Sequence, residues 1–460
     1  MGETDTIAAI ATAVGNSGIG IIRISGSESI KIADKVVGTK DGRSLKLCEK
    51  DSHTISYGFI FDEDTCIDEV LVFLYKAPRS YTAEDCVEIS CHGGMYVLNR
   101  ALNVVTKNGA RLAEPGEFTK RAFMNGRIDL TQSEAVMDII SSENEFSRNN
   151  SINQIRGGVK DMIISLREKL LHECAYIEAA LDDPEHYDLD GYVDELKIKI
   201  EEMIKDADEL IKSSEDVRFL KDGIRVVIVG RPNVGKSSLL NMLLGYERAI
   251  VTKEEGTTRD LIEERISFDG ITLNLIDTAG IRDSDNEAEK IGVKRAKEFA
   301  DKADLILFCL DSSEKMNDND REIMSLIKGR TAIIILNKSD LNQELFVDDI
   351  RKYSDDPVIM ISAKNNRGIS EIKDEIRKLF YNDKISDNNQ IYLTNQRQLN
   401  SFIKARKSLE LVKNSIEAGM GEDVLTVDLM DAYDELGKII GESTDDDLAD
   451  KIFEDFCMGK

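Results

Sequence analysis

The 460-residue sequence predicts a multidomain protein that combines α/β and all-α parts. Three observations support this fold class. Short runs rich in Ile, Val and Leu near the N-terminus are typical of strands, and they precede long stretches in which apolar residues recur at the helical spacings of three and four. A later segment alternates helical stretches with almost wholly apolar runs, which suit a parallel sheet buried on both faces. Helical spacing then returns near the C-terminus.

Residues 1–118 predict an N-terminal α/β domain, because apolar strand-like runs alternate there with turn signals. The predicted elements are strands at residues 18–26, 69–75 and 85–90 and a helix at residues 95–107. Asn108 and Gly109 follow this helix and are typical of a helix end.

Residues 119–218 predict the first part of an all-α domain, with helices at residues 152–171 and 193–211. The acidic stretch at residues 182–185 interrupts the helical pattern. It predicts a solvated loop rather than a metal site, because no spacing of His or carboxylate residues there favours ligation.

Residues 219–382 predict an α/β domain inserted into the all-α domain, whose second part is residues 383–460. Neither helical stretch looks self-sufficient, so we expect the helices before and after the insertion to pack together. The predicted strands are residues 224–229, 273–276, 305–310, 332–336 and 358–361, and the later helices are residues 399–417 and 424–440.

The formal net charge of −27 limits what the protein surface can bind. Binding to nucleic-acid phosphates needs clusters of Lys and Arg, so this charge argues against a protein that binds nucleic acid over its whole surface. A nucleic-acid substrate would be held mainly by a basic partner. No apolar run reaches the ~18 residues of a membrane span, and the acidic start is unlike a signal peptide. We therefore expect a cytoplasmic protein without a membrane segment.

A glycine-rich loop after the first strand of the inserted domain predicts phosphate binding. The sequence GRPNVGKS at residues 230–237 lets backbone N–H groups approach phosphate oxygens, since Gly230 and Gly235 carry no side chain. The loop leads into a helix near Lys236, whose N-terminus adds positive potential. We expect Lys236 to reach the β- and γ-phosphates and the hydroxyl of Ser237 to ligate Mg²⁺.

Further motifs follow at the ends of later strands and predict a guanine-nucleotide site. In GTTRD at residues 256–260, Thr258 is the expected second Mg²⁺ ligand. In DTAG at residues 277–280, Asp277 would hold the Mg²⁺ shell through water. In NKSD at residues 337–340, Asp340 can accept bonds from N1–H and N2–H of guanine, whereas adenine offers no such donor pair. Ser362-Ala363-Lys364 follows where a loop that supports the base is expected. Together these segments predict a Ras-like P-loop G domain that binds and hydrolyses GTP.

One position departs from the common small-GTPase pattern. Ile281 stands where those proteins carry a Gln that orients the attacking water. Another polar group must do this, and the following residues 282–289 offer several carboxylates between which spacing alone does not choose.

Motifs along the whole chain resemble the MnmE (TrmE) family of bacterial tRNA-modification GTPases. Beyond the G motifs, the resemblance rests on GIIRISG at residues 20–26, YTAED at 81–85, CHGG at 91–94, PGEFTKRAF at 115–123 and FCMGK at 456–460. It implies an N-terminal domain that forms a homodimer and binds 5-formyl-tetrahydrofolate or a related tetrahydrofolate, with contacts from Arg23, Glu88, Arg127 and Lys460. Arg127 occupies a position often held by Lys, and Met458 replaces a branched aliphatic residue. For Cys457 a functional role and a free terminal thiol are both open.

The resemblance also implies a K⁺ ion beside the phosphates, held by Asn233, Thr252, Glu254 and Thr257, and it makes Glu289 the carboxylate that orients the water. Catalysis would then rest on Glu289 and Lys236. The full set of implied GTP contacts is Gly230, Asn233, Val234, Gly235, Lys236, Ser237, Ser238, Thr252, Lys253, Glu254, Glu255, Gly256, Thr257, Thr258, Asp277, Thr278, Ala279, Gly280, Asn337, Lys338, Asp340, Ser362, Ala363 and Lys364.

The implied function is addition of a carboxymethylaminomethyl or aminomethyl group to C5 of the wobble uridine (position 34) of certain tRNAs, with the folate supplying a one-carbon unit. An FAD-containing partner of the MnmG (GidA) family would form a heterotetramer with the chain and make most tRNA contacts. Two alternatives stay open. One is a ribosome-assembly or translation-associated GTPase, which shares the G motifs but commonly carries a basic appendage. The other is a GTP-regulated one-carbon transferase, which needs a second substrate site in residues 1–118.

Overall fold

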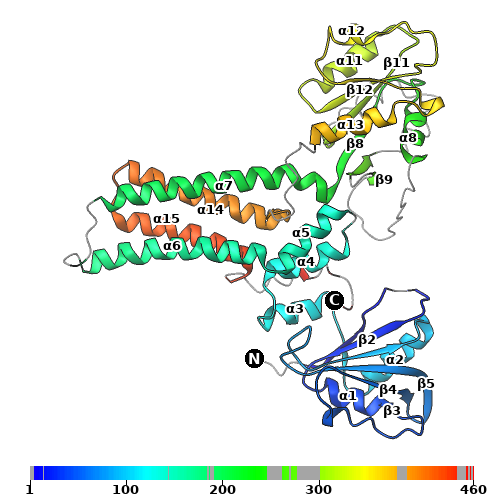
Figure 1. Ribbon diagram of the computed structural model, residues 1–460, viewed down its shortest axis with the longest axis vertical. Helices are drawn as coiled ribbons and strands as arrows, with labels where there is room; N and C mark the ends of the chain where they lie inside the picture. The colour runs from blue at the N-terminus through cyan, green and yellow to red at the C-terminus, as the bar shows by residue number, and fades with distance from the viewer. Residues whose placement is uncertain are drawn as a thin grey trace. The chain divides into compact units, whose positions relative to one another are not determined.

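The structure is a computed structural model that describes residues 5–13, 15–142, 144–183, 186, 191–245, 262–268, 271–276, 301–380, 391–442, 452–453, 456 and 459. Packing divides the chain into two compact units. Figure 1 shows the helices and strands with the labels used below. One unit holds residues 1–140, 152–205 and 400–460. The other holds residues 141–151 and 206–399.

A seven-stranded sheet in the order β3-β4-β5-β6-β2-β1-β7 forms the N-terminal part of the first unit. Its neighbouring strands are antiparallel except β1 and β7. Helices α1 and α2 cover one face, where they share an apolar core with Ile22, Ile24, Val87 and Ile89. Side chains alternate along a strand, so Arg23 lies on the opposite face. The elements are β1 (Ile7–Ile10), β2 (Gly20–Ser25), α1 (Ser29–Val36), β3 (Val37–Gly38), a 3₁₀ turn (Leu47–Glu49), β4 (Thr54–Asp62), β5 (Thr65–Tyr75), β6 (Cys86–Cys91), α2 (Met95–Lys107) and β7 (Arg111–Leu112).

The predicted helix at residues 95–107 has the bounds of α2, and the three predicted strands correspond to β2, β5 and β6. Strand β4 was not predicted. Its inward positions Ser56 and Gly58 are small, while Ile55 and Tyr57 on the other face are largely exposed. In an ordinary amphipathic strand the large apolar side chains point inward, whereas here Ile55 and Tyr57 point outward. The pattern of apolar and polar residues therefore did not predict β4.

Long helices form the rest of the first unit. Helix α6 packs along α15, and ion pairs join α7 to α14 through Lys197–Glu417 and Glu201–Lys413. The helices are α3 (Glu117–Met124), α4 (Leu130–Ile140), α5 (Glu145–Ile155), α6 (Gly158–Asp182), α7 (Tyr192–Asp222), α14 (Gln396–Glu417) and α15 (Glu422–Ile440). Helices α5, α7 and α14 continue into the second unit.

One predicted helix was wrong. The periodic stretch at residues 152–171 is divided between α5 and α6, because Gly157 adopts a φ of +95°, which favours glycine and ends a right-handed helix. The apolar spacing continues across this break, which is why periodicity alone suggested one helix.

The C-terminal segment returns to the N-terminal part of the same unit. Phe453 and Phe456 form an apolar cluster with Leu130. A Cβ on Gly116 would lie 2.5 Å from the carbonyl oxygen of Phe453, and one on Gly459 would lie 2.3 Å from that of Ile10. Backbones approach so closely at these two points that glycine is required.

The second unit is built on a six-stranded sheet in the order β13-β12-β11-β8-β10-β9. All described pairs are parallel except β9 with β10. Helices α8 and α13 cover one face and α11 covers the other. The elements are β8 (Ile224–Val229), α8 (Lys236–Gly245), β9 (Ile262–Phe268), β10 (Ile271–Ile276), β11 (Leu305–Asp311), α11 (Asp318–Ile327), β12 (Ala332–Asn337), α12 (Val347–Ile350), β13 (Val358–Met360), a 3₁₀ turn (Ala363–Asn365) and α13 (Ile369–Phe380).

Strand β8 lies at the point where the strand order of this sheet reverses, since β10 and β11 flank it on opposite sides. Ligands of open α/β sheets bind in the crevice outside the carboxyl ends of the strands at such a point. The loop after β8 is therefore the expected site. Separately, among the helices that the structure describes, none is long and apolar enough to cross a membrane.

Candidate functional site

The backbone of the loop between β8 and α8 requires glycine at two positions. Gly230 has a φ of +150° and Gly235 a φ of +97°. A Cβ on Gly230 would lie 2.4 Å from the carbonyl oxygen of Cys309, and one on Gly235 would lie 2.1 Å from Nδ2 of Asn337. Asn233 adopts a φ of +64°, which Asn tolerates better than most residues. The two glycines thus let the loop fold against β11 and β12.

Lys236, the first residue of α8, folds its side chain back over this loop. Its Nζ donates to the carbonyl oxygens of Gly230 and Arg231, both at 2.9 Å. Burial lowers the pKa of this ammonium group, because neutral carbonyls compensate a buried charge poorly. An anionic phosphate at the helix N-terminus would compensate it better, so the chemistry of the loop fits a phosphate group.

A second group of polar residues lies at the carboxyl end of β12. Asn337 donates from Nδ2 to the carbonyl oxygen of Val234 at 2.9 Å and accepts at Oδ1 from the N–H of Ala363 at 3.1 Å. It therefore joins the glycine loop to the segment after β13. The hydroxyl of Ser362 donates to Oδ1 of Asp340 at 2.6 Å, and this bond lowers the pKa of the Asp340 carboxyl. Asp340 is thus held as an ionised acceptor.

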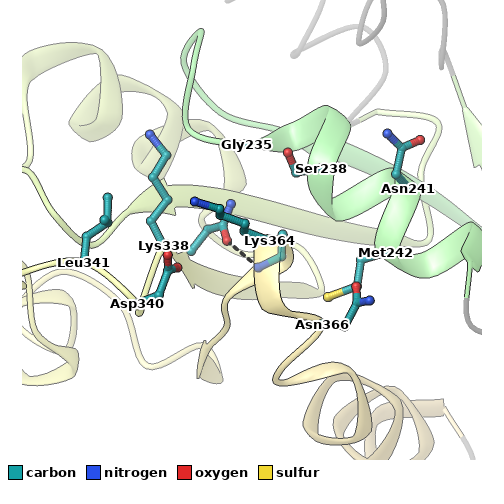
Figure 2. A pocket seen from close by; sticks show the side chains of 11 residues that line it. Gly235, Ser238, Asn241, Met242, Lys338, Asp340, Leu341, Lys364 and Asn366 are labelled. Atoms are coloured by element: carbon teal, nitrogen blue, oxygen red, sulfur yellow. Dashed lines mark hydrogen bonds between the residues drawn. The ribbon is translucent and has the colours of Figure 1, made fainter.

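These residues surround a cavity of about 490 Å³, which is within the range of small-ligand sites (Figure 2). In Figure 2 the Asp340 carboxylate and the side chains of Lys338 and Leu341 lie at one end, and Ser238 and Asn241 of α8 lie at the other. The lining residues are Gly235, Ser238, Asn241, Met242, Asn337, Lys338, Asp340, Leu341, Ala363, Lys364 and Asn366. The cavity thus lies beside the glycine loop, with an ionised carboxylate at its far end.

A separate polar cluster lies on the face of the N-terminal sheet opposite α1 and α2. Arg23 and Glu88 are directly opposite each other on β2 and β6, with Nε and Oε1 2.8 Å apart. Nη1 of Arg23 donates to the carbonyl oxygen of Gly459 at 3.3 Å. This contact brings the penultimate residue of the chain to the sheet.

Aromatic rings pack against the two arginines of this cluster. The guanidinium carbons of Arg23 and Arg127 each lie 5.1 Å from the centre of the Tyr81 ring, and Arg23 lies 5.5 Å from that of Phe118. Such contacts are favourable cation–π interactions. The Tyr81 hydroxyl forms a 2.8 Å hydrogen bond with that of Thr119, which fixes the ring.

Comparisons with known proteins agree along the whole chain. The family model described as "GTP-binding protein TrmE N-terminus" matches residues 6–127, and "MnmE helical domain" matches residues 130–457. The chain belongs to the MnmE family.

Curated relatives share its full length. A protein named tRNA modification GTPase MnmE from Lachnoclostridium phytofermentans is 51% identical over 458 residues, with 100% of both chains covered. One from Lactobacillus johnsonii is 45% identical, over 100% of this chain and 99% of that one. Among solved structures, the G domain of the T. maritima FeoB iron transporter is 26% identical and covers 34% of this chain and 97% of its own, at a TM-score of 0.26. A score of this size adds nothing to the assignment.

In this MnmE-family chain, the structure brings the described part of the predicted GTP site together at the carboxyl edge of the second sheet. These residues are Gly230, Asn233, Val234, Gly235, Lys236, Ser237, Ser238, Asn337, Lys338, Asp340, Ser362, Ala363 and Lys364. The remaining predicted residues lie outside the described part: Thr252, Lys253, Glu254, Glu255, Gly256, Thr257, Thr258, Asp277, Thr278, Ala279, Gly280 and Glu289. Their roles as GTP, Mg²⁺, K⁺ and water-orienting contacts stay predictions.

Three of the four predicted folate residues lie in one cluster: Arg23 and Arg127 both contact the Tyr81 ring, and Glu88 pairs with Arg23. Lys460 lies outside the described residues, directly after Gly459. Sequence reasoning assigned no role to Tyr81, Phe118 or Thr119, although all three fall within motifs on which the resemblance to the MnmE family rests. Their positions within the motifs YTAED and PGEFTKRAF were the signal that could have identified them.

Proposed function

We propose that this chain is the GTP-hydrolysing subunit of an enzyme that modifies the wobble uridine of tRNA at C5. As a member of the MnmE family it is a GTPase. The observation that supports the proposal is the cavity beside the glycine loop, which Asp340 lines, together with the buried ammonium group of Lys236 on that loop. Lys236 would bind the phosphates of a guanine nucleotide and Asp340 its base. The names of the full-length relatives give tRNA modification, and the choice of C5 of the wobble uridine follows from the resemblance to the MnmE family.

On nucleotide binding, we expect Lys236 to exchange the carbonyl oxygens of Gly230 and Arg231 for phosphate oxygens. Asp340 would accept the N1–H and N2–H of guanine, and its bond from Ser362 keeps it ionised for this. Ser237 and Thr258 would hold Mg²⁺, which neutralises phosphate charge when bound. Asn233, Thr252, Glu254 and Thr257 would hold K⁺, and Glu289 would orient the attacking water.

The polar cluster on the N-terminal sheet fits a tetrahydrofolate such as 5-formyl-tetrahydrofolate. Arg23, Arg127 and Lys460 would suit its anionic tail, and a carboxylate suits the N–H edge of a pterin. Oε1 of Glu88 is engaged by Arg23, whereas Oε2 accepts no hydrogen bond from the described part of the chain. We expect that second oxygen to accept a hydrogen bond from the ligand.

The proposed organisation is a G domain inserted into the helical domain. Residues 206–399 pack as part of one unit, while helical segments before and after them in sequence pack in the other, which supports this arrangement. We further propose that the chain works in the cytoplasm as a homodimer. An FAD-containing MnmG-type partner would complete a heterotetramer and make most of the tRNA contacts, in keeping with the net charge of −27.

The deciding experiment is nucleoside mass spectrometry of total tRNA from cells that lack this chain. We expect the 5-aminomethyl-type wobble uridines to disappear and to return with the wild-type chain but not with Lys236→Ala. An unchanged nucleoside profile would instead favour the ribosome-assembly GTPase, and accumulated ribosomal precursors would then be the observation to seek.

A further inference from the structure

Asp311 is a buried carboxylate close to the nucleotide cavity that no sequence motif identified. It is the last residue of β11, it is 3% exposed, and it pairs in register with Asn337 of β12. Oδ2 accepts from Nζ of Lys338 at 2.5 Å, and Oδ1 accepts from the hydroxyl and the N–H of Ser313 at 2.6 and 2.9 Å. Both oxygens of this buried charge are therefore satisfied.

The geometry of Lys338 explains what this pairing does. Its φ of +63° is unusual for a lysine and turns the chain sharply at the end of β12. In Figure 2 the side chain runs past the cavity with its ammonium group pointing away from Asp340. The methylene stem thus forms part of the cavity wall, while the charge is held at Asp311.

We infer that Asp311 is a positioning residue for the purine base, acting through Lys338. This inference rests on the proposed guanine-nucleotide function. By holding the ammonium group, Asp311 keeps the lysine stem as one apolar wall of the slot that ends at Asp340. Without the carboxylate, the long side chain regains its rotamer freedom, and its charge can turn into the slot.

The loss expected from removing this charge is large enough to measure. The bond between Asp311 and Lys338 lies within the protein, so its loss changes the Kd only through the position of Lys338. We expect an effect of about tenfold, at the lower end of what one hydrogen bond to a charged group contributes. Asp311→Asn keeps the size of the side chain and can still accept from Ser313, so it removes chiefly the charge that holds Lys338.

The test is a double-mutant cycle on the full chain, measured as the Kd of a fluorescent GDP analogue. The variants are Asp311→Asn, Lys338→Met, which keeps the stem without the ammonium group, and the two combined. We expect Asp311→Asn to weaken binding about tenfold in the wild-type background and less than about twofold beside Lys338→Met. The matched control is Asp304→Asn, which breaks the pair with Arg225 just before β11 begins and should leave Kd unchanged.

An equal loss in both backgrounds would overturn the inference, because Asp311 would then act through the fold and not through Lys338. An unchanged Kd for Asp311→Asn alone would also overturn it. Should Asp311→Asn fail to fold, Ser313→Ala removes one partner of the same carboxylate, and a few-fold loss that disappears beside Lys338→Met is expected. Absence of GDP binding by the wild-type chain would instead contradict the proposed function.

Discussion

Arg23 and Glu88 lie opposite each other on adjacent antiparallel strands and form an ion pair of 2.8 Å in which both side chains are less than one-fifth exposed. The same guanidinium group also reaches the backbone of Gly459, 436 positions later in the chain. One arginine thus joins the centre of the N-terminal sheet to the end of the protein. This relationship makes the sheet and the C-terminus parts of a single candidate site.

Glu88→Gln should weaken binding of 5-formyl-tetrahydrofolate by about tenfold or more, because the variant loses a charged acceptor for the pterin N–H edge. Titration calorimetry on the purified chain measures this directly. Glu28→Gln is the matched control, since Glu28 pairs with Lys31 at the exposed surface of the same domain. Folate affinity that stays unchanged in Glu88→Gln would remove Glu88 from the site.

Gly459→Ala should displace the C-terminus from β1, because its Cβ would lie 2.3 Å from the Ile10 carbonyl oxygen at a φ of +83°. We expect folate affinity to fall while GDP affinity stays the same. Gly419→Ala provides the control, since Gly419 also has a positive φ, +64°, but open space around it. If both variants bound folate like the wild type, the C-terminal segment would not belong to the site.

Asp340→Asn should weaken GDP binding and improve binding of xanthosine diphosphate. The amide can donate to the second ring carbonyl of xanthine, whereas it loses one of the two acceptors that guanine requires. Competition against fluorescent GDP measures both affinities. Asp349→Asn, in an exposed pair with Lys352 of the same domain, should change neither, and an unaltered base preference in Asp340→Asn would contradict the base assignment.

GTP turnover should be fast in K⁺ and much slower in Na⁺ at equal ionic strength, because the smaller ion fits a site built for K⁺ poorly. A steady-state phosphate-release assay with Rb⁺, which is close to K⁺ in size, as a third condition separates ion size from ionic strength. Asn233→Ala should reduce the difference between the salts. Equal rates in K⁺ and Na⁺ would end the proposal of a K⁺ site.

Stability should fall in acid partly through Glu117. Burial would raise the pKa of this carboxyl, but hydrogen bonds from Arg111, from the N–H of Glu114 and from Arg121 lower it overall. A pKa below the ordinary 4.5 means that the folded state favours the ionised form. Its contribution to stability is therefore present above about pH 4.5 and is lost as the pH falls below that value.

Urea unfolding of Glu117→Gln measures this contribution. The variant should be less stable than the wild type near neutral pH, and the difference should shrink in acid. Glu49→Gln, at a 70% exposed side chain on the surface of the same domain, should show no such change. A difference in stability that does not vary with pH would mean that Glu117 acts by shape and not by charge.

Much of the nucleotide site was predictable from sequence, because each of its motifs is a short run of consecutive residues. Each motif follows an apolar strand, and parallel strands end at one edge of the sheet, so Gly230, Asn337 and Ser362 had to lie near one another. The helix at residues 95–107 was predicted to the residue for the same reason, since apolar spacing and end signals lie within it. Asp311 was missed because it resembles any polar residue at the end of a strand.

The sequence by itself determined the family, the G motifs and the order of α/β and helical parts, because these depend on residues near one another in the chain. Only the tertiary structure decided that Arg23 contacts both Glu88 and Gly459. The same holds for the stacking of two arginines on Tyr81 and for the ion pair between Asp311 and Lys338. Such pairings depend on strand register and on the return of the C-terminus to β1. Both arise from the packing of segments far apart in sequence, which local periodicity does not encode.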